Sequence, residues 1–372
     1  MDEILKALAA ALHGEGPAVE IVTAPDGTAR AVPVETPGFE DAAVVVRTSG
    51  STGTPKATVL TVDALAASSM ATAIALRGEG QWLLALPLQY VAGVQVLVRS
   101  LFAGTRPWAM DLSGGFTPDA FTAAAGELTD TIRFTSLVPT QLQRLLDSPA
   151  PDTLAVLRRF NAILLGGAPA PAGLLDAARD AGLHVVTTYG SAETCGGCVY
   201  DGEPLDGVEV RIDAEGRILL GGDTVAAGYL DAPGAADFFE EDGIRWYRTG
   251  DLGELSPDGK LTVLSRADDV IITGGVKVSA AHVQAGLEKL DGVRAAFVTG
   301  VPSAEWGQAV AAYVAVSDTV MTAEELLAAA RSLLGAMAPK TVVTASELPL
   351  LPNGKPDRLA MAALLSERHQ AE

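Results

Sequence analysis

The sequence predicts an α/β protein: a large N-terminal domain of mainly parallel sheets with flanking helices, a smaller β subdomain, and a small α+β C-terminal domain. Three observations support this class. Apolar segments alternate with helical ones between residues 82 and 188, which is typical of parallel strands joined by crossover helices. After Tyr200 the segments shorten and the turns are rich in Gly, Asp and Pro, which favours antiparallel strands. About 100 residues follow Arg266, enough for one small domain.

The expected elements follow in order along the chain. Residues 2–13 place apolar side chains at helical spacing, and Gly14 can end that helix. A β-branched segment at 42–47 predicts a strand that leads directly into a loop at 48–56. The strands expected after it are 82–86, 133–137, 162–165, 185–188, 208–212 and 218–220. The remaining helices are expected near 61–76, 117–128, 140–147, 171–181 and 323–336.

The last of these helices has a defined start. Thr322 and Glu325 stand three residues apart before an apolar run, and this spacing is that of a capping box. The pattern of segments changes near Arg266, so we expect one domain over 1–267 and a second over 268–372.

Charge and composition exclude several classes of partner. The formal net charge of −20 argues against nucleic acid and anionic membranes, because both require a basic surface. The chain starts with acidic residues where a secretory signal needs basic ones, and no apolar run approaches the ~20 residues of a membrane span. We therefore expect a cytoplasmic enzyme of small-molecule substrates, without membrane insertion. The sequence leaves open whether it is a homodimer.

Cys195 and Cys198 form a C-x-x-C pair. A redox pair would begin a helix after a strand, and a zinc site would need two further ligands at similar spacing. The sequence offers neither context, and the four histidines are scattered. Buried thiols without metal or dithiol chemistry are the expectation.

The loop at 48–56 has the composition of an anion site. Its glycines let backbone N–H groups approach an anion, its hydroxyls add donors, and Lys56 adds charge for a polyphosphate. A Walker A loop is excluded because Lys56 precedes Ala57 rather than Ser or Thr. A flexible Ser/Gly loop between a strand and a helix is the alternative. The residues expected to bind phosphate are Thr48, Ser49, Gly50, Ser51, Thr52, Gly53, Thr54 and Lys56.

This loop and five later segments resemble, in the same order, the motifs of the adenylate-forming superfamily of acyl-CoA synthetases, peptide-synthetase adenylation domains and luciferases. The matching segments are 47–56, 166–169, 188–194, 247–253, 266–278 and 352–355. Six motifs in one order are far more specific than any single one. The resemblance implies that the enzyme uses ATP, with Mg²⁺, to activate a carboxylic acid as acyl-AMP, and then transfers the acyl group to a thiol such as that of CoA.

The resemblance also assigns roles to individual residues. Lys355 is implied as the adenylation lysine, Glu193 and Thr194 as further catalytic residues, and Glu193 also as the Mg²⁺ ligand. Asp268 is implied as the hinge about which a mobile C-terminal domain rotates. Without the resemblance, Lys355 and Glu193 would read as solvated loop residues. The other implied residues are Gly167, Ala168, Pro169, Tyr189, Gly190, Asp251 and Arg266 for ATP, and Gly274, Gly275 and Lys277 for the CoA side.

A closer resemblance is to the o-succinylbenzoate–CoA ligases of menaquinone biosynthesis, in particular the compact actinobacterial type. Segments 86–93, 135–146 and 193–200 carry it. A benzoate with a second carboxylate needs small residues around its ring and polar groups at its far end. The residues expected to contact it are Gln89, Tyr90, Thr135, Ser136, Arg144, Ser191, Gly196 and Gly197.

Two positions depart from the family pattern. Gln89 and Tyr90 stand where relatives often have a histidine, and Ser265 replaces the glycine usual before the hinge arginine. Other functions also stay open: another aryl- or short-acyl-CoA synthetase, an enzyme that loads a carrier protein, or a nucleotide-binding protein without catalysis. A Ser-His-Asp hydrolase is disfavoured because no G-x-S-x-G elbow follows a predicted strand.

Overall fold

A computed structural model describes residues 1–24, 27–49, 55–147, 149–170, 172–232, 235–317, 322–351 and 356–371. The chain divides into two compact units. Unit 1 comprises Met1–Asp213, Leu219–Thr249 and Leu255–Leu261, and unit 2 comprises Ala214–Ile218, Gly250–Glu254 and Thr262–Glu372. The expected boundary between residues 267 and 268 falls in a 3₁₀ turn, η2 (Ala267–Asp269), and it stays a prediction.

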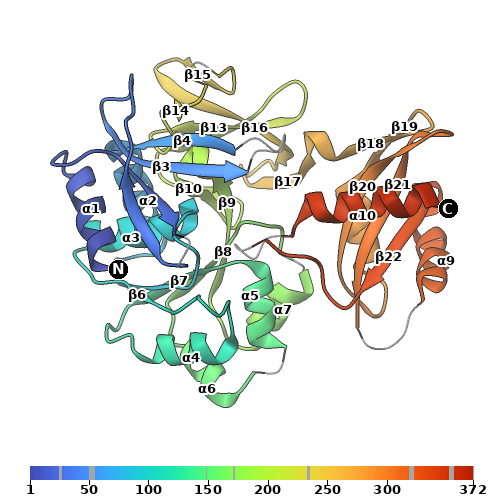
Figure 1. Ribbon diagram of the computed structural model, residues 1–372, viewed down its shortest axis with the longest axis horizontal. Helices are drawn as coiled ribbons and strands as arrows, with labels where there is room; N and C mark the ends of the chain where they lie inside the picture. The colour runs from blue at the N-terminus through green and yellow to red at the C-terminus, as the bar shows by residue number, and fades with distance from the viewer. Residues whose placement is uncertain are drawn as a thin grey trace. The chain divides into compact units, whose positions relative to one another are not determined.

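A seven-stranded sheet of unit 1 has the order β11-β10-β9-β8-β7-β5-β6 (Figure 1). The five strands from β9 to β6 run parallel, as predicted, because helices connect them. β10 and β11 extend one edge in the antiparallel direction. The strands are β5 (Gln81–Leu84), β6 (Trp108–Ala109), β7 (Arg133–Leu137), β8 (Ala162–Leu165), β9 (Val185–Ser191), β10 (Gly196–Tyr200) and β11 (Glu203–Pro204).

Helices cover both faces of this sheet. On one face, Leu83, Leu137 and Ile163 share an apolar cluster with four helices, which Figure 1 shows gathered together. Side chains alternate along a strand, so Trp82 and Phe134 point to the other face, where α3 packs. The four helices are α4 (Pro118–Gly126), α5 (Pro139–Leu146), α6 (Pro151–Leu157) and α7 (Ala172–Asp180), and the other face carries α2 (Val62–Ala75) and α3 (Val91–Phe102).

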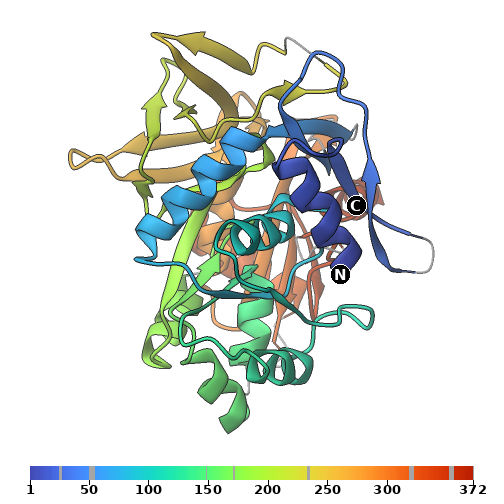
Figure 2. The same cartoon turned by 90° about the vertical axis from the view of Figure 1, so that its left-hand side faces the viewer.

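A second sheet of unit 1 has the order β14-β4-β3-β1-β2. The expected N-terminal helix is α1 (Asp2–Leu12), which faces the viewer together with α2 in Figure 2. The strands are β1 (Val19–Thr23), β2 (Ala29–Pro33), β3 (Ala42–Ser49), β4 (Pro55–Thr61) and β14 (Gly228–Tyr229).

A third, mainly antiparallel sheet corresponds to the predicted β subdomain. Its order is β12-β13-β16-β15, with β17 paired to β16. The chain passes between the two units within β13, β16 and β17. The strands are β12 (Val208–Ile212), β13 (Arg217–Gly222), β15 (Phe238–Glu241), β16 (Ile244–Leu255) and β17 (Leu261–Arg266).

The C-terminal part of unit 2 is a small α+β fold. Its sheet has the order β19-β18-β21-β20, with β22 parallel to β21, and two separate apolar clusters pack on it. Thr322 and Glu325 form the predicted capping box at the start of α9. The elements are β18 (Val270–Thr273), β19 (Val276–Ser279), α8 (Ala280–Leu287), β20 (Val293–Ser303), β21 (Gly307–Val316), α9 (Ala323–Leu334), β22 (Thr341–Ala345) and α10 (Arg358–Ala371). No helix in the described part of the chain has the length and apolar character of a membrane span.

Candidate active site

The predicted phosphate loop connects two antiparallel strands. β3 ends at Ser49, β4 begins at Pro55, and Thr48 pairs with Lys56 across the hairpin. The alternative of a loop between a strand and a helix is wrong, because α2 begins only after β4. Lys355 and the side chain of Ser49 lie outside the described residues, and so do Gly50, Ser51, Thr52, Gly53 and Thr54.

Lys56, the second residue of β4, contacts a carboxylate and an aromatic ring. Its Nζ lies 3.3 Å from Asp237 Oδ2 and 4.4 Å from the centre of the Tyr229 ring. The lysine side chain is 43% exposed, so solvent screens the ion pair, and pairs of this kind contribute at most about 1 kcal/mol. A polyphosphate can therefore compete with Asp237 for this cation at small cost.

Glu193 lies in a 3₁₀ turn, η1 (Ala192–Thr194), between β9 and β10. The hydroxyl of Thr194 accepts a hydrogen bond from the backbone N–H of Ser191 and donates to the carbonyl of Gly196, at 3.0 and 2.8 Å. Thr194 is fully buried. Its hydroxyl therefore fixes the turn that carries Glu193.

Gly190 allows the two strands to approach closely beside this turn. Its φ is +157°, and a Cβ on it would lie only 2.1 Å from the carbonyl oxygen of Gly196. Only glycine fits such a position, since real Cβ atoms keep more than 3 Å from backbone atoms. This close approach explains why a glycine follows Tyr189 in the motif at 188–194.

The carboxylate of Glu193 is buried and hydrogen-bonded. Glu193 is only 7% exposed, and its Oε1 accepts a hydrogen bond of 2.8 Å from the hydroxyl of Tyr229. Burial, and next the charge of Glu193, raise the pKa of Tyr229, so the phenol stays a donor. The backbone carbonyl of Glu193 accepts from Ala226. Tyr229 thus connects Glu193 with Lys56, whose ammonium lies over the tyrosine ring.

The sequence reasoning missed Tyr229 and Asp237. Tyr229 follows Gly228 in β14, which pairs with β4 next to Lys56. Neither residue belongs to one of the six motifs, and the pairing joins segments about 170 residues apart. A tyrosine after a glycine in a turn-rich region carries no local signal for such a contact.

The residues present fit a magnesium ion that arrives with ATP. No group of three or more His, Cys, Asp or Glu within the described ranges can hold a metal. Mg²⁺ needs only one or two carboxylates when water and substrate phosphates supply the other ligands. The buried carboxylate of Glu193 is suited to that arrangement rather than to a metal enclosed by protein.

One group of residues predicted to bind ATP follows the carboxyl end of β8, where α/β sheets bind ligands, and another lies near the carboxyl end of β9. A Cβ on Gly166 would lie 2.3 Å from Thr188 Oγ1, so this glycine brings the loop after β8 against β9. Tyr189 and Gly190 are part of β9. The loop itself contains Gly167, Ala168 and Pro169, which are exposed or half-buried.

Asp251 and Arg266 come together in unit 2. Arg266 Nη1 lies 3.7 Å from Asp251 Oδ1, and a Cβ on Gly250 would lie 3.0 Å from Arg266 Nη2. These two side chains, both predicted to bind ATP, are therefore neighbours. The hinge candidate Asp268 belongs to η2, and its side chain is outside the described part.

The predicted CoA-side residues form a tight hairpin in unit 2. Gly274 and Gly275 connect β18 to β19 with φ values of +55° and +83°, which two-residue turns of this type require. A Cβ on Gly274 would meet the ring of Trp306 at 2.7 Å. Lys277 is exposed on β19.

The predicted acyl-side residues before α3, in β7 and in α5 differ in their exposure and hydrogen bonding. Gln89 and Tyr90 precede α3 and are half-buried, and burial raises the pKa of Tyr90. The fully buried hydroxyl of Thr135 donates to the carbonyl of Leu83, which leaves it no free donor. Ser136 is buried in β7, whereas Arg144 is exposed on α5.

The β9–β10 hairpin provides the other acyl-side candidates. Ser191 Oγ is buried and has no hydrogen-bond partner among the described residues. Gly196 has a φ of +96°, and a Cβ on it would touch Gln95 at 3.4 Å. Gly197 packs closely against Tyr200. A side chain at Gly197 would therefore crowd its neighbours.

Cys195 and Cys198 are free and fully buried, as expected. Burial raises the pKa of Cys195 strongly and that of Cys198 to about 12. Both sulfurs therefore stay thiols at neutral pH, which excludes a thiolate nucleophile at these positions.

Comparison with known proteins identifies relatives over almost the whole chain. The family model for AMP-binding enzymes matches residues 4–230, and that for the AMP-binding enzyme C-terminal domain matches residues 282–355. A probable 2-succinylbenzoate–CoA ligase of Mycobacterium tuberculosis (strain H37Rv) is 44% identical over 96% of this chain and 94% of that protein. The 2-succinylbenzoate–CoA ligase of Listeria monocytogenes is 30% identical over 90% of this chain and 72% of that protein.

Solved structures agree with the fold class. The o-succinylbenzoate CoA synthetase of Bacillus subtilis, in complex with its acyl-adenylate intermediate, has a TM-score of 0.72 and 27% identity over 90% of this chain and 72% of its own. ATP-bound MatB from Rhodopseudomonas palustris has a TM-score of 0.77 and 26% identity over 93% of this chain and 75% of its own. Since one family model spans more than half of the sequence and the six motifs follow in order, the chain belongs to the AMP-binding, adenylate-forming enzymes.

Proposed function

We propose that this enzyme is a 2-succinylbenzoate–CoA ligase, which converts the acid, ATP and CoA into 2-succinylbenzoyl-CoA, AMP and diphosphate. The observation that carries the proposal is the 44% identity, over 96% of the chain, to a relative named for this reaction. The match covers the segments that hold all six motifs, since it spans 96% of this chain and 94% of the relative.

The reaction is the sum of two displacements. In the first, a carboxylate oxygen of the acid attacks the α-phosphorus of ATP, and the bond from that phosphorus to the bridging oxygen of diphosphate breaks. In the second, the sulfur of CoA, having lost its proton, attacks the acyl carbon, and the bond to AMP breaks. Both steps bring anions together, so catalysis requires cations that hold the reacting groups in line.

In this proposal the cations have separate tasks. Lys56 meets the phosphates, and Glu193 holds the Mg²⁺ of the ATP complex, whose charge offsets that of the phosphates. Lys355 neutralises the carboxylate and the α-phosphate during adenylation. The buried position of Glu193 and its bond from Tyr229 support this assignment, because a fixed ligand needs little reorganisation when the metal arrives.

The acyl group is proposed to lie beside the β9–β10 hairpin. Ser191 supplies a hydroxyl there without a described partner, and Gly196 and Gly197 carry no side chain that the ring would have to avoid. Gln89 and Tyr90, which precede α3, are further polar candidates. Thr135 is the weakest candidate, since its hydroxyl is already donated to Leu83.

A coupled assay of AMP release and CoA-thioester formation tests the proposal. The enzyme is incubated with ATP, Mg²⁺, CoA and 2-succinylbenzoate, beside benzoate, acetate and a medium-chain acid. We expect 2-succinylbenzoate to give the highest kcat/KM, with equal amounts of AMP and thioester.

Other outcomes would separate the alternatives. Preference for another acid keeps the adenylate-forming mechanism and overturns the substrate. Acid-dependent exchange of labelled diphosphate into ATP, without any free CoA thioester, indicates loading of a carrier protein. ATP binding without exchange indicates a nucleotide-binding protein without catalysis.

A further inference from the structure

The turn that carries Glu193 is held by two buried side chains, one from α2 and one from α3. Gln95 Nε2 donates to the carbonyl of Cys195 at 2.5 Å, and Ser68 Oγ donates to the same carbonyl at 3.2 Å. Gln95 Nε2 also donates to Ser68 Oγ at 3.2 Å, so the two donors are themselves connected. Gln95 is only 1% exposed, and Ser68 is fully buried. Both helices therefore meet the β9–β10 hairpin at one atom, the carbonyl oxygen of Cys195.

The backbone of Cys195 has a conformation that needs such support. Cys195 ends η1 with φ +52° and ψ +35°, in the left-handed region, which costs free energy for any residue with a Cβ. Four non-glycine residues in the described part of the chain have a positive φ, and Cys195 is the buried one among them. Since Cys195 is fully buried, side chains rather than water must satisfy its carbonyl.

Cys195 stands between groups that the proposed reaction uses. Glu193 lies two residues before it, and Gly196, predicted to contact the acid, follows it directly. The hydroxyl of Thr194 closes the turn by its bond to the carbonyl of Gly196. A Cβ on Gly196 would lie 3.4 Å from Gln95 Cγ, so the stem of Gln95 packs against this residue as well. A shift of the Cys195 carbonyl would therefore displace its neighbours on both sides.

The amide of Gln95 fits in one orientation. Its Nε2 must face the carbonyl of Cys195, because two oxygens in this position would repel each other. Its Oε1 is then buried and has no hydrogen-bond partner among the described residues. A buried oxygen without a partner lowers stability. Stability alone therefore does not account for an amide at this position.

We propose that Gln95 is a positioning residue of the adenylation step, which holds the Cys195 carbonyl together with Ser68 and so fixes the carboxylate of Glu193. The inference rests on the proposed role of Glu193 as a ligand of the Mg²⁺ that arrives with ATP. In this role Gln95 touches neither the metal nor the phosphates and acts through the turn.

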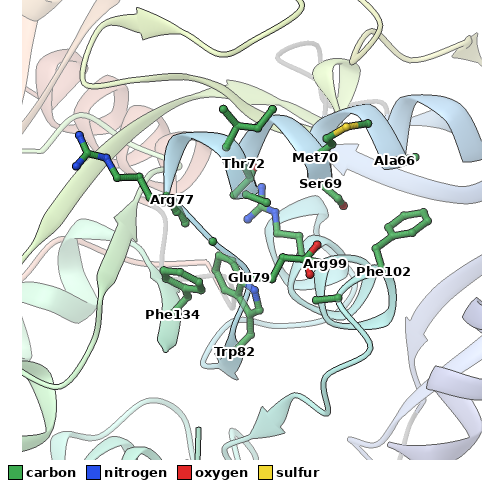
Figure 3. A pocket seen from close by; sticks show the side chains of 15 residues that line it. Ala66, Ser69, Met70, Thr72, Arg77, Glu79, Trp82, Arg99, Phe102 and Phe134 are labelled. Carbon is green, nitrogen blue, oxygen red and sulfur yellow. The ribbon is translucent and has the colours of Figure 1, made fainter. Parts of the chain in front are cut away.

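A second pair of side chains, one turn further along the same helices, bonds the other end of β10. Thr72 shares a hydrogen bond of 3.1 Å with the hydroxyl of Tyr200, and Arg99 Nη2 donates to that hydroxyl at 3.4 Å. Figure 3 shows Thr72 on α2 and Arg99 on α3, in the wall of a hollow of about 540 Å³. Both residues are buried. Because Tyr200 is the last residue of β10, this pair offers a matched control that does not touch the turn.

The Mg²⁺ dependence of acid-dependent diphosphate exchange into ATP tests the proposal. Gln95→Met keeps the length of the side chain and removes both N–H donors. It should raise the Mg²⁺ concentration that gives half the maximal rate roughly 3- to 10-fold, the effect of about one net hydrogen bond. Saturating Mg²⁺ should recover the rate to within about threefold of the wild type. Ser68→Ala should raise the half-saturating concentration roughly 2- to 5-fold.

Thr72→Val is the matched control. It removes a buried hydroxyl from the same helix without a change of shape, and the half-saturating Mg²⁺ concentration should stay within about twofold of the wild type. A loss of folded enzyme lowers the rate by the same factor at every Mg²⁺ concentration. A merely structural role of Gln95 would therefore leave the half-saturating concentration unchanged.

Glu193→Gln is the reference for a lost metal ligand and should raise the half-saturating Mg²⁺ concentration more than Gln95→Met does. If Glu193→Gln raises it while Gln95→Met behaves like Thr72→Val, the positioning role of Gln95 is wrong and the metal ligand stands. If Glu193→Gln keeps the wild-type value, the proposed metal ligand is wrong, and the inference about Gln95 is lost with it.

The comparison does not depend on the proposed substrate. Each variant is assayed with the acid that the wild type converts fastest, so preference for an acid other than 2-succinylbenzoate overturns the substrate and leaves the Mg²⁺ comparison intact. Calorimetric titration with ATP at the same Mg²⁺ concentrations repeats the comparison without turnover. There Gln95→Met should again need more Mg²⁺ than Thr72→Val, and equal requirements would overturn the proposal.

Discussion

At the scale of single residues, the carboxylate of Glu193 is held by a neighbour that none of the motifs contains. Tyr229 donates to the carboxylate of Glu193 and places its ring beneath the ammonium of Lys56. Asp237 holds that ammonium from the other side. One aromatic side chain thus fixes the distance between the proposed phosphate ligand and the proposed metal ligand.

Tyr229→Phe should lower kcat/KM for the acid roughly 10- to 100-fold at limiting Mg²⁺, because a hydrogen bond to a buried charge contributes about 1.5–3 kcal/mol. The loss should shrink when Mg²⁺ is raised, since the variant still has the carboxylate of Glu193. Steady-state rates over a range of Mg²⁺ concentrations measure both effects.

Tyr200→Phe is the matched control for this variant. It removes a buried hydroxyl that bonds Thr72 rather than Glu193, so activity should stay within about twofold of the wild type. If Tyr229→Phe shows the same Mg²⁺ dependence as Tyr200→Phe, the proposed positioning role is wrong.

A second prediction at the residue scale concerns Gly190. In Gly190→Ala the new Cβ would lie 2.1 Å from the carbonyl of Gly196, so the β9–β10 hairpin must open. We expect a loss of unfolding free energy of more than about 2 kcal/mol and loss of activity. Denaturant titration measures the stability of the variant.

The control is a glycine with space around it. Gly173 in α7 has no atom within 4 Å of its ideal Cβ, so Gly173→Ala should stabilise the protein by up to about 1 kcal/mol through helix propensity. Equal behaviour of Gly190→Ala and Gly173→Ala would contradict the steric reading of the hairpin.

At the scale of elements, the parallel strands could be predicted and α3 could not. β7 and β8 have the predicted bounds, because each is a short apolar run between turns. In α3 every residue from Gly93 to Ser100 is buried, so the middle of the helix has no exposed face, and its valines resemble those of a strand. β4 was missed for another reason: its pairing with β3 is decided across the hairpin and not by its own composition.

The site divides in the same way. The six motifs pointed to Glu193 and to the glycine-rich turns at 166–169 and 274–275. These positions demand particular residue types, so a motif can mark them. The motifs could not identify Tyr229, Asp237 or Gln95, which reach the site from other elements. Partners of that kind follow from packing, which a single sequence does not encode locally.

The end of α8 gives a prediction about pH. Glu288 caps this helix at its C-terminus, where the helix dipole disfavours negative charge, and burial raises its pKa above the usual 4.5. The folded state thus holds the proton more tightly than the unfolded chain, so this contribution to stability is fully present below pH 4.5 and is lost as the pH rises through the higher pKa of the folded state. Glu288→Gln should therefore stabilise the protein at pH 7 by about 0.3–1 kcal/mol and have little effect near pH 4.

Denaturant midpoints at both pH values check this. Glu324→Gln is the control, because Glu324 is exposed in the first turn of α9, where a negative charge is favourable. That variant should lose a few tenths of a kcal/mol at pH 7. A destabilised Glu288→Gln at pH 7 would show that the bonds from Gln284 and Ala296 need the charged acceptor.

At the scale of the whole molecule, two half-reactions with different electrostatic needs must use one acyl site. Adenylation needs a cation between the carboxylate and the α-phosphate, whereas thioester formation needs access for a thiol. Lys355 and the Gly274–Lys277 hairpin both belong to the C-terminal part of the chain. Rotation about Asp268 would exchange one for the other, and the two steps can then be separated by mutation.

Lys355→Ala should reduce the formation of acyl-AMP at least about 100-fold, because adenylation loses a cation that acts only on that step. Thioester formation from supplied acyl-AMP should stay near the wild-type rate. Asp268→Pro should impair one half-reaction selectively, since proline restricts the backbone at the hinge. Single-turnover assays of each step measure the two rates separately. Lys289→Ala, which removes an exposed lysine after α8, should leave both unchanged. If Lys355→Ala slows both steps equally, the lysine is not specific to adenylation, and the alternation of two states about Asp268 loses its chemical reason.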